Sequence, residues 1–193
     1  MTRVIAGMTI SLDGFLADRE RNIGTLYSDF DTYQESDALR ASIEETGAAL
    51  MGRTTFDMAD DPDTYADSYE YQVPIFVVTH EPPPVHPKEN DRLAFTFVTD
   101  GIEPAVALAT EAAGDKAVAV IGGAEINRQL LRADLVDELH IDIMPVFLGE
   151  GLRLFDDPAL ERTGLELIDC QRTGERVHLR YRTRRASGAI QEA

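Results

Sequence analysis

The sequence has no tryptophan and a single cysteine, and the cysteine shortage excludes two kinds of structure. Cys170 is the only cysteine among the 193 residues, so the chain can form neither an intrachain disulfide nor a zinc site built on several cysteines. Because a free thiol behaves as a small hydrophobic group, we expect Cys170 to be buried on a strand. No apolar run approaches the roughly 18 residues that a membrane span needs, and the first ten residues do not look like a signal peptide. We therefore predict a cytoplasmic protein that does not span a membrane.

Basic residues are also scarce. The chain has 18 Lys and Arg against 35 Asp and Glu, a formal net charge of −17, and Lys88 and Lys116 are the only lysines. Nucleic acids and anionic membrane surfaces attract basic proteins, so this charge argues against both as partners. It does not exclude a small anionic ligand, because one pocket can be positive on an acidic protein. The acidic surface fits either solubility at high salt or the composition of the genome, and the sequence leaves both open.

Strand patterns alternate with helix patterns along most of the chain, and strand patterns alone close it. The expected strands are residues 3–12, 48–52, 75–79, 93–99, 116–123, 136–149, 165–171 and 175–184, and the expected helices are residues 31–47, 53–59, 101–114 and 124–135. Residues 15–30 fit a loop, and the last two strands fit a hairpin. This order predicts an α/β domain over residues 1–185, with a mostly parallel central sheet between two helical layers and antiparallel C-terminal strands. Residues 186–193 are expected to form a flexible tail.

A first candidate site lies in the stretch MGRTTFD. Gly52 ends an expected strand, and Arg53, Thr54 and Thr55 begin the helix that follows. Free backbone N–H groups, the positive end of a helix dipole, a guanidinium and two hydroxyls meet there, and this combination favours an anion. The alternative is an ordinary helix start with Arg53 facing solvent.

Two more junctions fall at strand ends. The stretch VVTH brings Thr79 and His80 to the carboxyl end of a strand, where open α/β sheets bind ligands; the alternative is a turn capped by Thr79 with His80 merely exposed. Gly122 and Gly123 join a strand to a helix, which indicates either a tight turn or backbone that passes close to a ligand. The sequence has neither the G-x-G-x-x-G pattern of dinucleotide-binding folds nor a P-loop. In a parallel sheet all three junctions lie at one edge, so a ligand with several phosphates could contact all of them.

Together, several stretches of the sequence resemble a known family. MTISLDGFLA, LMGRTTFD, VVTH, VIGGAEINRQLL and LVDELHIDIMPVFLGEGLRLF follow the order and approximate spacing found in the dihydrofolate reductase-like superfamily. They most resemble the branch that contains the C-terminal reductase domain of the riboflavin-biosynthesis deaminase/reductase, from about Thr2 to Arg184. The resemblance implies a dihydrofolate reductase-like fold and NADPH as cofactor. It also implies a homodimer, with IDIMPVFLGEG as a candidate interface or, alternatively, as a central strand covered by helices.

The resemblance also assigns roles at the three junctions. The residues that would contact NADPH are Gly52, Arg53, Thr54, Thr55, Thr79, His80, Gly122, Gly123, Ala124, Glu125 and Ile126. The first four would hold its phosphates, the next two would lie near the 2′-phosphate of the adenosine, and the last five would pass beneath the pyrophosphate and nicotinamide half. Since the Gly-Gly bond is typically cis in this superfamily, we expect a cis peptide between Gly122 and Gly123.

The chain departs from the family's pattern in several places. Dihydrofolate reductases carry one carboxylate early on the first long helix, where it helps to protonate the substrate. Asp37 lies near that position and is a candidate proton donor, and Glu35 is a second residue that could take the position. The alternative is that Asp37 is only an exposed charge, which the helix dipole favours in a first turn. Asp13, at the start of the loop that would lie over the active site, is the other candidate proton donor. Folate enzymes carry a tryptophan in that loop and this chain has none, which makes folate a doubtful substrate. The zinc pattern of the riboflavin deaminase is missing too, so we expect a free-standing reductase domain.

These observations predict an NADPH-dependent oxidoreductase that transfers a hydride to a C=N or C=O bond of a small heterocyclic or sugar-like substrate, such as 5-amino-6-ribosylaminouracil phosphate or a pterin. The alternative is a non-catalytic protein that keeps an NADP(H) site as a sensor or scaffold. The acidic residues 57–70 lack the spacing of a calcium loop and are expected to form a solvated loop near the substrate mouth. His140 and His178 fall within strand patterns, and no two histidines have metal-ligand spacing, so we expect packing and surface roles and no metal.

Overall fold

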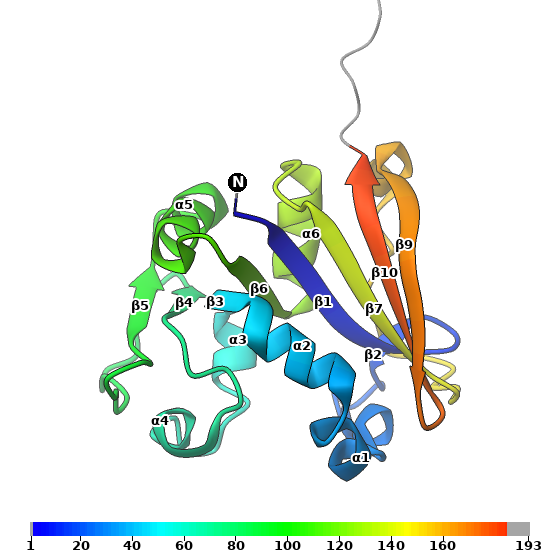
Figure 1. Cartoon of the computed structure of the whole chain (residues 1–193), viewed down its shortest axis with the longest axis horizontal. Coiled ribbons are helices and arrows are strands. Elements are labelled where there is room, and N and C mark those ends of the chain that lie inside the picture. Colours follow the sequence, from blue (N-terminus) through cyan, green and yellow to red (C-terminus); the bar gives the residue numbers. More distant parts are fainter. Residues whose placement is uncertain (1, 185–193) are drawn as a thin grey trace, which may run out of the picture.

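A single large sheet forms the centre of the protein (Figure 1). The structure is a computed structural model and describes residues 2–184; the expected tail, residues 186–193, lies outside them. The sheet has eight strands in the order β5-β4-β3-β6-β1-β7-β10-β9. In chain order they are β1 (Val4–Ser11), β3 (Thr46–Gly52), β4 (Ile75–Val78), β5 (Phe95–Val98), β6 (Ala117–Gly122), β7 (Glu138–Met144), β9 (Gly164–Thr173) and β10 (Arg176–Arg184). All pairs from β5 to β7 are parallel, and β10 pairs antiparallel with β7 and β9, which confirms the predicted sheet.

Helices cover both faces of this sheet and complete the predicted three layers. They are α1 (Phe30–Gln34), α2 (Asp37–Glu45), α3 (Arg53–Phe56), α4 (Thr64–Ser68), α5 (Ile102–Ala113) and α6 (Ala124–Arg132). Short 3-10 helices span Gly24–Tyr27 and Pro158–Arg162, and β2 (Phe15–Ala17) pairs with β8 (Leu152–Arg153) beside the main sheet. Figure 1 shows α2 and α6 on opposite sides of the sheet.

The two faces of the sheet bury different side chains. Helices α5 and α6 pack against an apolar face, where Val118 and Val120 belong to the same core as Leu130. On the opposite face α3 and α4 bury an aromatic cluster that includes Phe56 and Tyr65. Because side chains alternate along a strand, the strands β1, β7 and β10 present their polar residues to this second face, toward α1 and α2.

Residues 31–47, predicted as one helix, form two helices and the start of a strand. The hydroxyl of Ser36 accepts a hydrogen bond from the N–H of Leu39 at 3.1 Å, so it caps the beginning of α2 and separates it from α1. The chain then passes straight into β3, and Gly47 lies inside that strand rather than ending a helix. A Cβ at Gly47 would lie 2.5 Å from the carbonyl oxygen of Ala113, so the glycine allows β3 to approach the end of α5.

Three smaller expectations were also wrong. The strand predicted over residues 136–149 ends at Met144, because Pro145 has no N–H to continue the ladder. The expected loop, residues 15–30, contains β2 and a 3-10 turn. Cys170 is exposed rather than buried, because it lies on β9, the edge strand of the sheet.

Candidate functional site

The carboxyl ends of β3, β4 and β6 lie side by side at one edge of the sheet. Strand β3 pairs with both neighbours, and its last residues, Met51 and Gly52, lie opposite Gly122 of β6 and Val78 of β4. The three turns that follow these strands are therefore neighbours, as the parallel arrangement predicts. They contain every residue that we expected to contact NADPH.

The first and third junctions touch each other. A Cβ at Gly52 would lie 2.8 Å from Cγ1 of Ile126, so the glycine lets the end of β3 pack against the start of α6. The hydroxyl oxygen of Thr55 is 3.5 Å from the position that a Cβ would take at Gly122, and equally far from that position at Gly123. A hydroxyl group on α3 thus lies beside the backbone of the glycine pair.

Arg53 connects the first junction to the second. Its Nη1 donates a hydrogen bond to the carbonyl oxygen of Glu81 at 2.9 Å. The hydroxyl of Thr79 donates to the same oxygen at 2.7 Å, which fixes the turn after β4, and His80 is exposed within that turn. Nε of Arg53 donates to both carboxylate oxygens of Asp57, at 2.7 and 2.8 Å, so a phosphate at this junction would share the guanidinium with a carboxylate.

The glycine pair has the backbone that we expected. The bond between Gly122 and Gly123 is cis, which confirms the prediction, and Gly122 has a φ of +125°. Gly123 is the N-cap residue of α6. Beyond it the side chains of Ala124 and Ile126 are buried, so only their backbone could contact a ligand, and Glu125 is exposed.

The residues present at this edge fit a dinucleotide. Gly52, Gly122 and Gly123 lie at the ends of adjacent strands, where their lack of side chains lets Ile126, Met8 and Thr55 approach the backbone, and Thr54 and Thr55 lie on the short helix that follows β3. Asn127 adds a buried amide: its Nδ2 donates to the carbonyl oxygen of Gly123 at 3.2 Å, and its Oδ1 has no hydrogen-bond partner within residues 2–184. Exposed N–H groups at the start of a helix are the groups that bind phosphates.

Asp13, the first candidate proton donor, has a structural role in the loop. The hydroxyl of Ser11 donates to its Oδ1 at 2.6 Å, and the N–H groups of Leu148 and Gly149 donate to the carboxylate at 3.2 and 2.8 Å. These hydrogen bonds, the one from Ser11 above all, hold the pKa of Asp13 below its usual value of 3.8. An aspartate with a lowered pKa is ionised at neutral pH and is a poor proton donor.

Asp37, the second candidate, lies in the first turn of α2 and faces solvent. Its side chain is 95% exposed and pairs with Nη2 of Arg40 at 2.8 Å. This is the alternative that we gave for an acidic residue at a helix start. The residues of α2 that line a cavity between this helix and the sheet are Ala38, Leu39 and Ser42.

A cavity of about 180 Å³ lies between α1, α2 and the polar face of the sheet, next to the glycine pair. Three tyrosines, Tyr27, Tyr33 and Tyr71, line it, together with residues of β1, β6, β7 and β10. Burial raises the pKa of each tyrosine, to about 12 for Tyr71. Glu70 lines its rim: although the residue as a whole is exposed, desolvation of its carboxyl raises its pKa.

Beside the cavity, Arg176 lies at the centre of a buried polar network. The residue is 0% exposed, and its guanidinium donates four hydrogen bonds. Two go to Asp29 at 2.6 and 3.0 Å, one to Thr9 at 2.9 Å and one to the carbonyl oxygen of Leu26 at 2.9 Å. Asp142 adds an ion pair at 3.5 Å. Burial alone would lower the pKa of Arg176, but the two carboxylates outweigh it and the pKa is raised.

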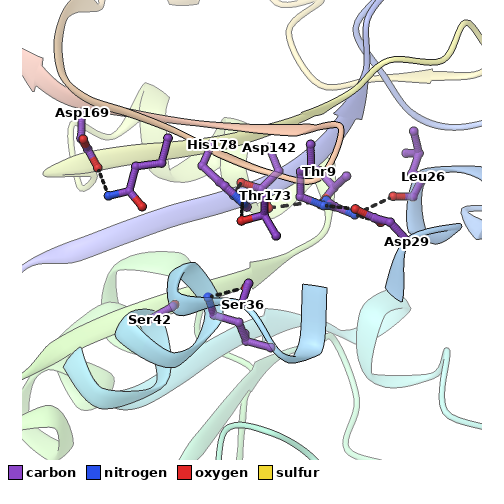
Figure 2. Close-up of polar contacts among 12 residues, drawn as sticks. Thr9, Leu26, Asp29, Ser36, Ser42, Asp142, Asp169, Thr173 and His178 are labelled. Atoms are coloured by element: carbon purple, nitrogen blue, oxygen red, sulfur yellow. Dashed lines mark hydrogen bonds and ion pairs between the residues drawn. The ribbon is translucent and has the colours of Figure 1, made fainter. Parts of the chain in front are cut away.

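The network continues to His178, which lines the cavity. Its Nδ1 lies 2.6 Å from Oδ1 of Asp142, and its Nε2 lies 3.0 Å from the hydroxyl of Thr173. Figure 2 shows these residues in a row along the strands, with Ser42 across from them on α2. The ring of Tyr33 stacks on His178 and also lies 4.6 Å from the guanidinium carbon of Arg176. Both nitrogens of His178 are therefore engaged, and the histidine has the packing role that we expected.

Sequence reasoning missed most residues of the cavity. One signal was present: on β7 and β10, polar residues recur at every second position, His140 and Asp142 on one strand and Arg176 and His178 on the other. A polar set on one face of a central strand indicates either solvent or a lined pocket. No signal in the sequence pointed to Glu70, which we had placed in a solvated acidic loop.

Two classes of site receive no support from the described part of the chain. Between residues 2 and 184, no helix is both long and apolar enough to cross a bilayer. Over the same range, no three His, Cys, Asp or Glu side chains gather in a way that could hold a metal ion.

Comparisons with known proteins agree with this geometry. The chain is 26% identical to the YwjB protein of Bacillus subtilis (strain 168), over 93% of this chain and 97% of that one. Its structure is similar to that of a protein from Shewanella sp. PV-4 that carries a provisional riboflavin-biosynthesis name, with a TM-score of 0.76, 24% identity, and coverage of 95% and 100% of the two chains. It is also similar to dihydrofolate reductase from Enterococcus faecalis complexed with NADP(H) and RAB-propyl, with a TM-score of 0.59, 14% identity and coverage of 94% and 96%. Residues 2–179 match the model of the RibD C-terminal domain, so the chain belongs to the RibD C-terminal domain family, with a dihydrofolate reductase-like fold.

Proposed function

We propose that the protein is an NADPH-dependent reductase that delivers a hydride to a C=N or C=O bond of a small substrate. The observation that supports this most strongly is that the sheet edge and the cavity are continuous. Met8 and Ile121 line the cavity, and Sδ of Met8 lies 3.3 Å from the position of a Cβ at Gly122. When bound, the nicotinamide supplies the hydride, and the protein supplies orientation and exclusion of water.

The proposal gives each junction a task in binding. Backbone N–H groups after Gly52, the hydroxyls of Thr54 and Thr55 and the guanidinium of Arg53 would hold phosphates. The remaining contacts would come from Thr79 and His80 at the 2′-phosphate and from residues 122–126 beneath the pyrophosphate and nicotinamide. Both the bare backbone and the hydroxyls suit oxygen-rich ligands.

The proton that accompanies the hydride needs a source near the cavity. Asp142 is paired with Arg176 and His178, and His140 lies 3.1 Å from a carboxylate oxygen of Glu138. The Glu70 carboxyl forms no ion pair within residues 2–184, and desolvation raises its pKa although the carboxyl accepts a hydrogen bond from its own backbone N–H. We therefore assign the proton to Glu70 rather than to Asp13 or Asp37.

A non-catalytic NADP(H) sensor or scaffold remains the second candidate. It would need the nucleotide edge but not a lined cavity beside it, so the cavity favours the reductase. We also propose a homodimer, since Phe147 in the stretch IDIMPVFLGEG is 75% exposed, and a measurement of mass in solution tests it. A cytoplasmic location stays a prediction from the sequence.

The test measures NADPH affinity and NADPH oxidation with a panel of pterins, quinones and ribosylaminopyrimidines. Arg53→Ala should weaken NADPH binding by about tenfold to a hundredfold, because one charged hydrogen bond contributes about 1.5–3 kcal/mol. Arg40→Ala is the matched control. Arg40 is also paired with an aspartate, Asp37, but both residues lie on α2, so this change should leave the affinity for NADPH unchanged.

Each outcome has a defined meaning. Equal NADPH affinity of Arg53→Ala and the unmodified protein would contradict the phosphate assignment. Tight NADPH binding without oxidation by any member of the panel would favour the sensor. If NADPH does not bind at all, both candidate functions are wrong.

A further inference from the structure

We infer that the 2′-phosphate of NADPH adds almost no affinity at the nucleotide edge, so that the protein binds NADH about as tightly as NADPH. The inference rests on the proposed function in placing a dinucleotide at this edge, with the 2′-phosphate at Thr79 and His80. NADPH differs from NADH only in that phosphate, which is attached to the 2′-hydroxyl of the adenosine ribose. The charges and hydrogen bonds of the turns around it therefore decide which dinucleotide binds better.

The turns after β4 and β5 lie side by side at this edge. The two strands are parallel, with Val78 opposite Val98, and the N–H of Thr79 donates to the carbonyl oxygen of Val98 at 3.0 Å. This pairing brings residues 79–81 and residues 99–103 together. A 2′-phosphate at the turn after β4 would therefore be close to the turn after β5 as well.

These two turns carry acidic side chains and no lysine or arginine. Glu81, Asp100 and Glu103 are exposed, and His80 is the one residue of the two segments that can carry a positive charge. A phosphate ester has a charge of about −1.5 to −2, and carboxylates within a Debye length of about 8–10 Å repel it. A ribose that keeps its 2′-hydroxyl is not repelled, because a carboxylate can accept a hydrogen bond from the hydroxyl.

The neutral donors of the two turns are already engaged. The hydroxyl of Thr79 donates to the carbonyl oxygen of Glu81 at 2.7 Å and accepts from the N–H of Glu81 at 3.3 Å. At the start of α5, Pro104 has no N–H to offer. A carboxylate oxygen of Glu103 lies 3.9 Å from the position that a Cβ would take at Gly101, the N-cap residue of α5. A phosphate would therefore meet a carboxylate at this helix start.

Arg53 reaches the turn after β4, but its charge is offset. Its Nε donates to both carboxylate oxygens of Asp57, at 2.7 and 2.8 Å, and its Nη1 donates to the carbonyl oxygen of Glu81 at 2.9 Å. A nearby carboxylate cancels much of the attraction that a guanidinium exerts on a second anion. In the proposed function Arg53 holds phosphates that NADH and NADPH have in common, so it does not distinguish them.

A site that prefers NADPH donates charged hydrogen bonds to the 2′-phosphate, typically from an arginine. One such bond increases affinity by about tenfold to a hundredfold. The two turns offer His80 alone, against three carboxylates. We therefore expect attraction and repulsion of the 2′-phosphate to cancel nearly completely.

The experiment measures binding on the full chain by calorimetry, with NADPH and NADH as one matched pair and NADP⁺ and NAD⁺ as the other. The oxidised pair reports on binding without a hydride to transfer. We expect NADPH to bind no more than about threefold more tightly than NADH, because exposed charges contribute little to affinity. A larger preference for NADPH would overturn the inference.

A pair of variants tests whether the acidic turns set this ratio. Asp100→Arg replaces repulsion by attraction in the turn after β5, and NADPH should then bind about tenfold more tightly than NADH. Asp115→Arg is the matched control, since Asp115 is also exposed but follows the other end of α5, and should leave the ratio unchanged. Equal ratios in the two variants would overturn the inference.

The variant Arg53→Ala gives a third readout. If Arg53 holds phosphates that both dinucleotides carry, the change weakens the binding of NADH and NADPH by the same factor. A loss confined to NADPH would show that the 2′-phosphate gains affinity from this edge, and would overturn the inference.

This inference and the reductase fail separately. Equal binding of NADH and NADPH, with neither oxidised by any member of the panel, would support the inference and contradict the reductase. Oxidation of NADPH by a protein that binds NADH much more weakly would support the reductase and contradict the inference. If neither dinucleotide binds, both are wrong.

Discussion

Replacing Arg176 by methionine should destabilise the protein by about 3 kcal/mol. Methionine keeps much of the side-chain length but removes the charge that faces Asp29 and Asp142. Breaking a buried ion pair by removing one partner costs about 3–5 kcal/mol, because the other charge stays buried without compensation. The side chains of Asp29 and Asp142 keep 20% and 17% of their surface exposed, so we expect the lower end of that range.

Two further losses add to this effect. The carbonyl oxygen of Leu26 and the hydroxyl of Thr9 lose a donor inside the protein, and an unsatisfied buried polar group costs about 1–3 kcal/mol. The ring of Tyr33 loses a cation–π contact. Relaxation of the site and entry of water offset part of these losses, so we keep 3 kcal/mol as the expected value. That is a large fraction of the 5–15 kcal/mol that stabilises a typical domain.

Denaturant unfolding followed by circular dichroism measures the change as a shift of the midpoint at constant slope. Arg19→Met is the matched control, since Arg19 pairs with Glu150 on the surface, with 79% and 67% of the side chains exposed, and should change stability by less than about 0.5 kcal/mol. Adding Asp29→Asn to Arg176→Met should cost less than the sum of the single changes, because the two residues contact each other. A loss below 1 kcal/mol for Arg176→Met, or full additivity of the pair, would refute the reasoning.

Two other predictions concern stability. Gly47→Ala should destabilise the protein by about 1–3 kcal/mol in thermal unfolding, because the new Cβ would lie 2.5 Å from the carbonyl oxygen of Ala113; an unchanged midpoint would show that β3 and α5 can separate at no cost. Asp13 has a pKa below its usual value of 3.8, so its contribution to stability is present above pH 3.8 and is lost as the pH falls through the lowered pKa. Asp13→Asn should therefore reduce the free energy of unfolding near neutral pH and make it depend less on pH below about pH 4, and parallel acid-unfolding curves for the two proteins would contradict this.

The sequence by itself determined the order of the elements and placed together the three junctions at which we propose that the nucleotide binds. Strand and helix patterns alternate along most of the chain, and parallel pairing then requires the carboxyl ends of β3, β4 and β6 to meet. The local sequence was enough to place Gly52, Arg53 and the Gly122–Gly123 pair at that edge, because each lies within a few residues of a strand end. The cis bond between Gly122 and Gly123 was expected from the resemblance to the superfamily, and the structure has it.

The ends of the helices and strands were harder to predict, because they depend on contacts with distant parts of the chain. Gly47 looked like the end of a helix, yet its lack of a side chain serves the contact between β3 and Ala113 of α5. Cys170 looked like a buried thiol, but its strand became the edge of the sheet. Burial of a strand residue depends on what packs on its face, and local sequence does not contain that information.

Only the tertiary structure decided the cavity. Arg176 lies 147 residues from Asp29 and 167 residues from Thr9 along the chain, and nothing near Arg176 in the sequence distinguishes it from the exposed arginines of the same strand. It is buried because α1 and the turn before it fold over the polar face of β1, β7 and β10. A buried guanidinium requires partners within hydrogen-bond distance, and that requirement is met only when these segments come together around the cavity.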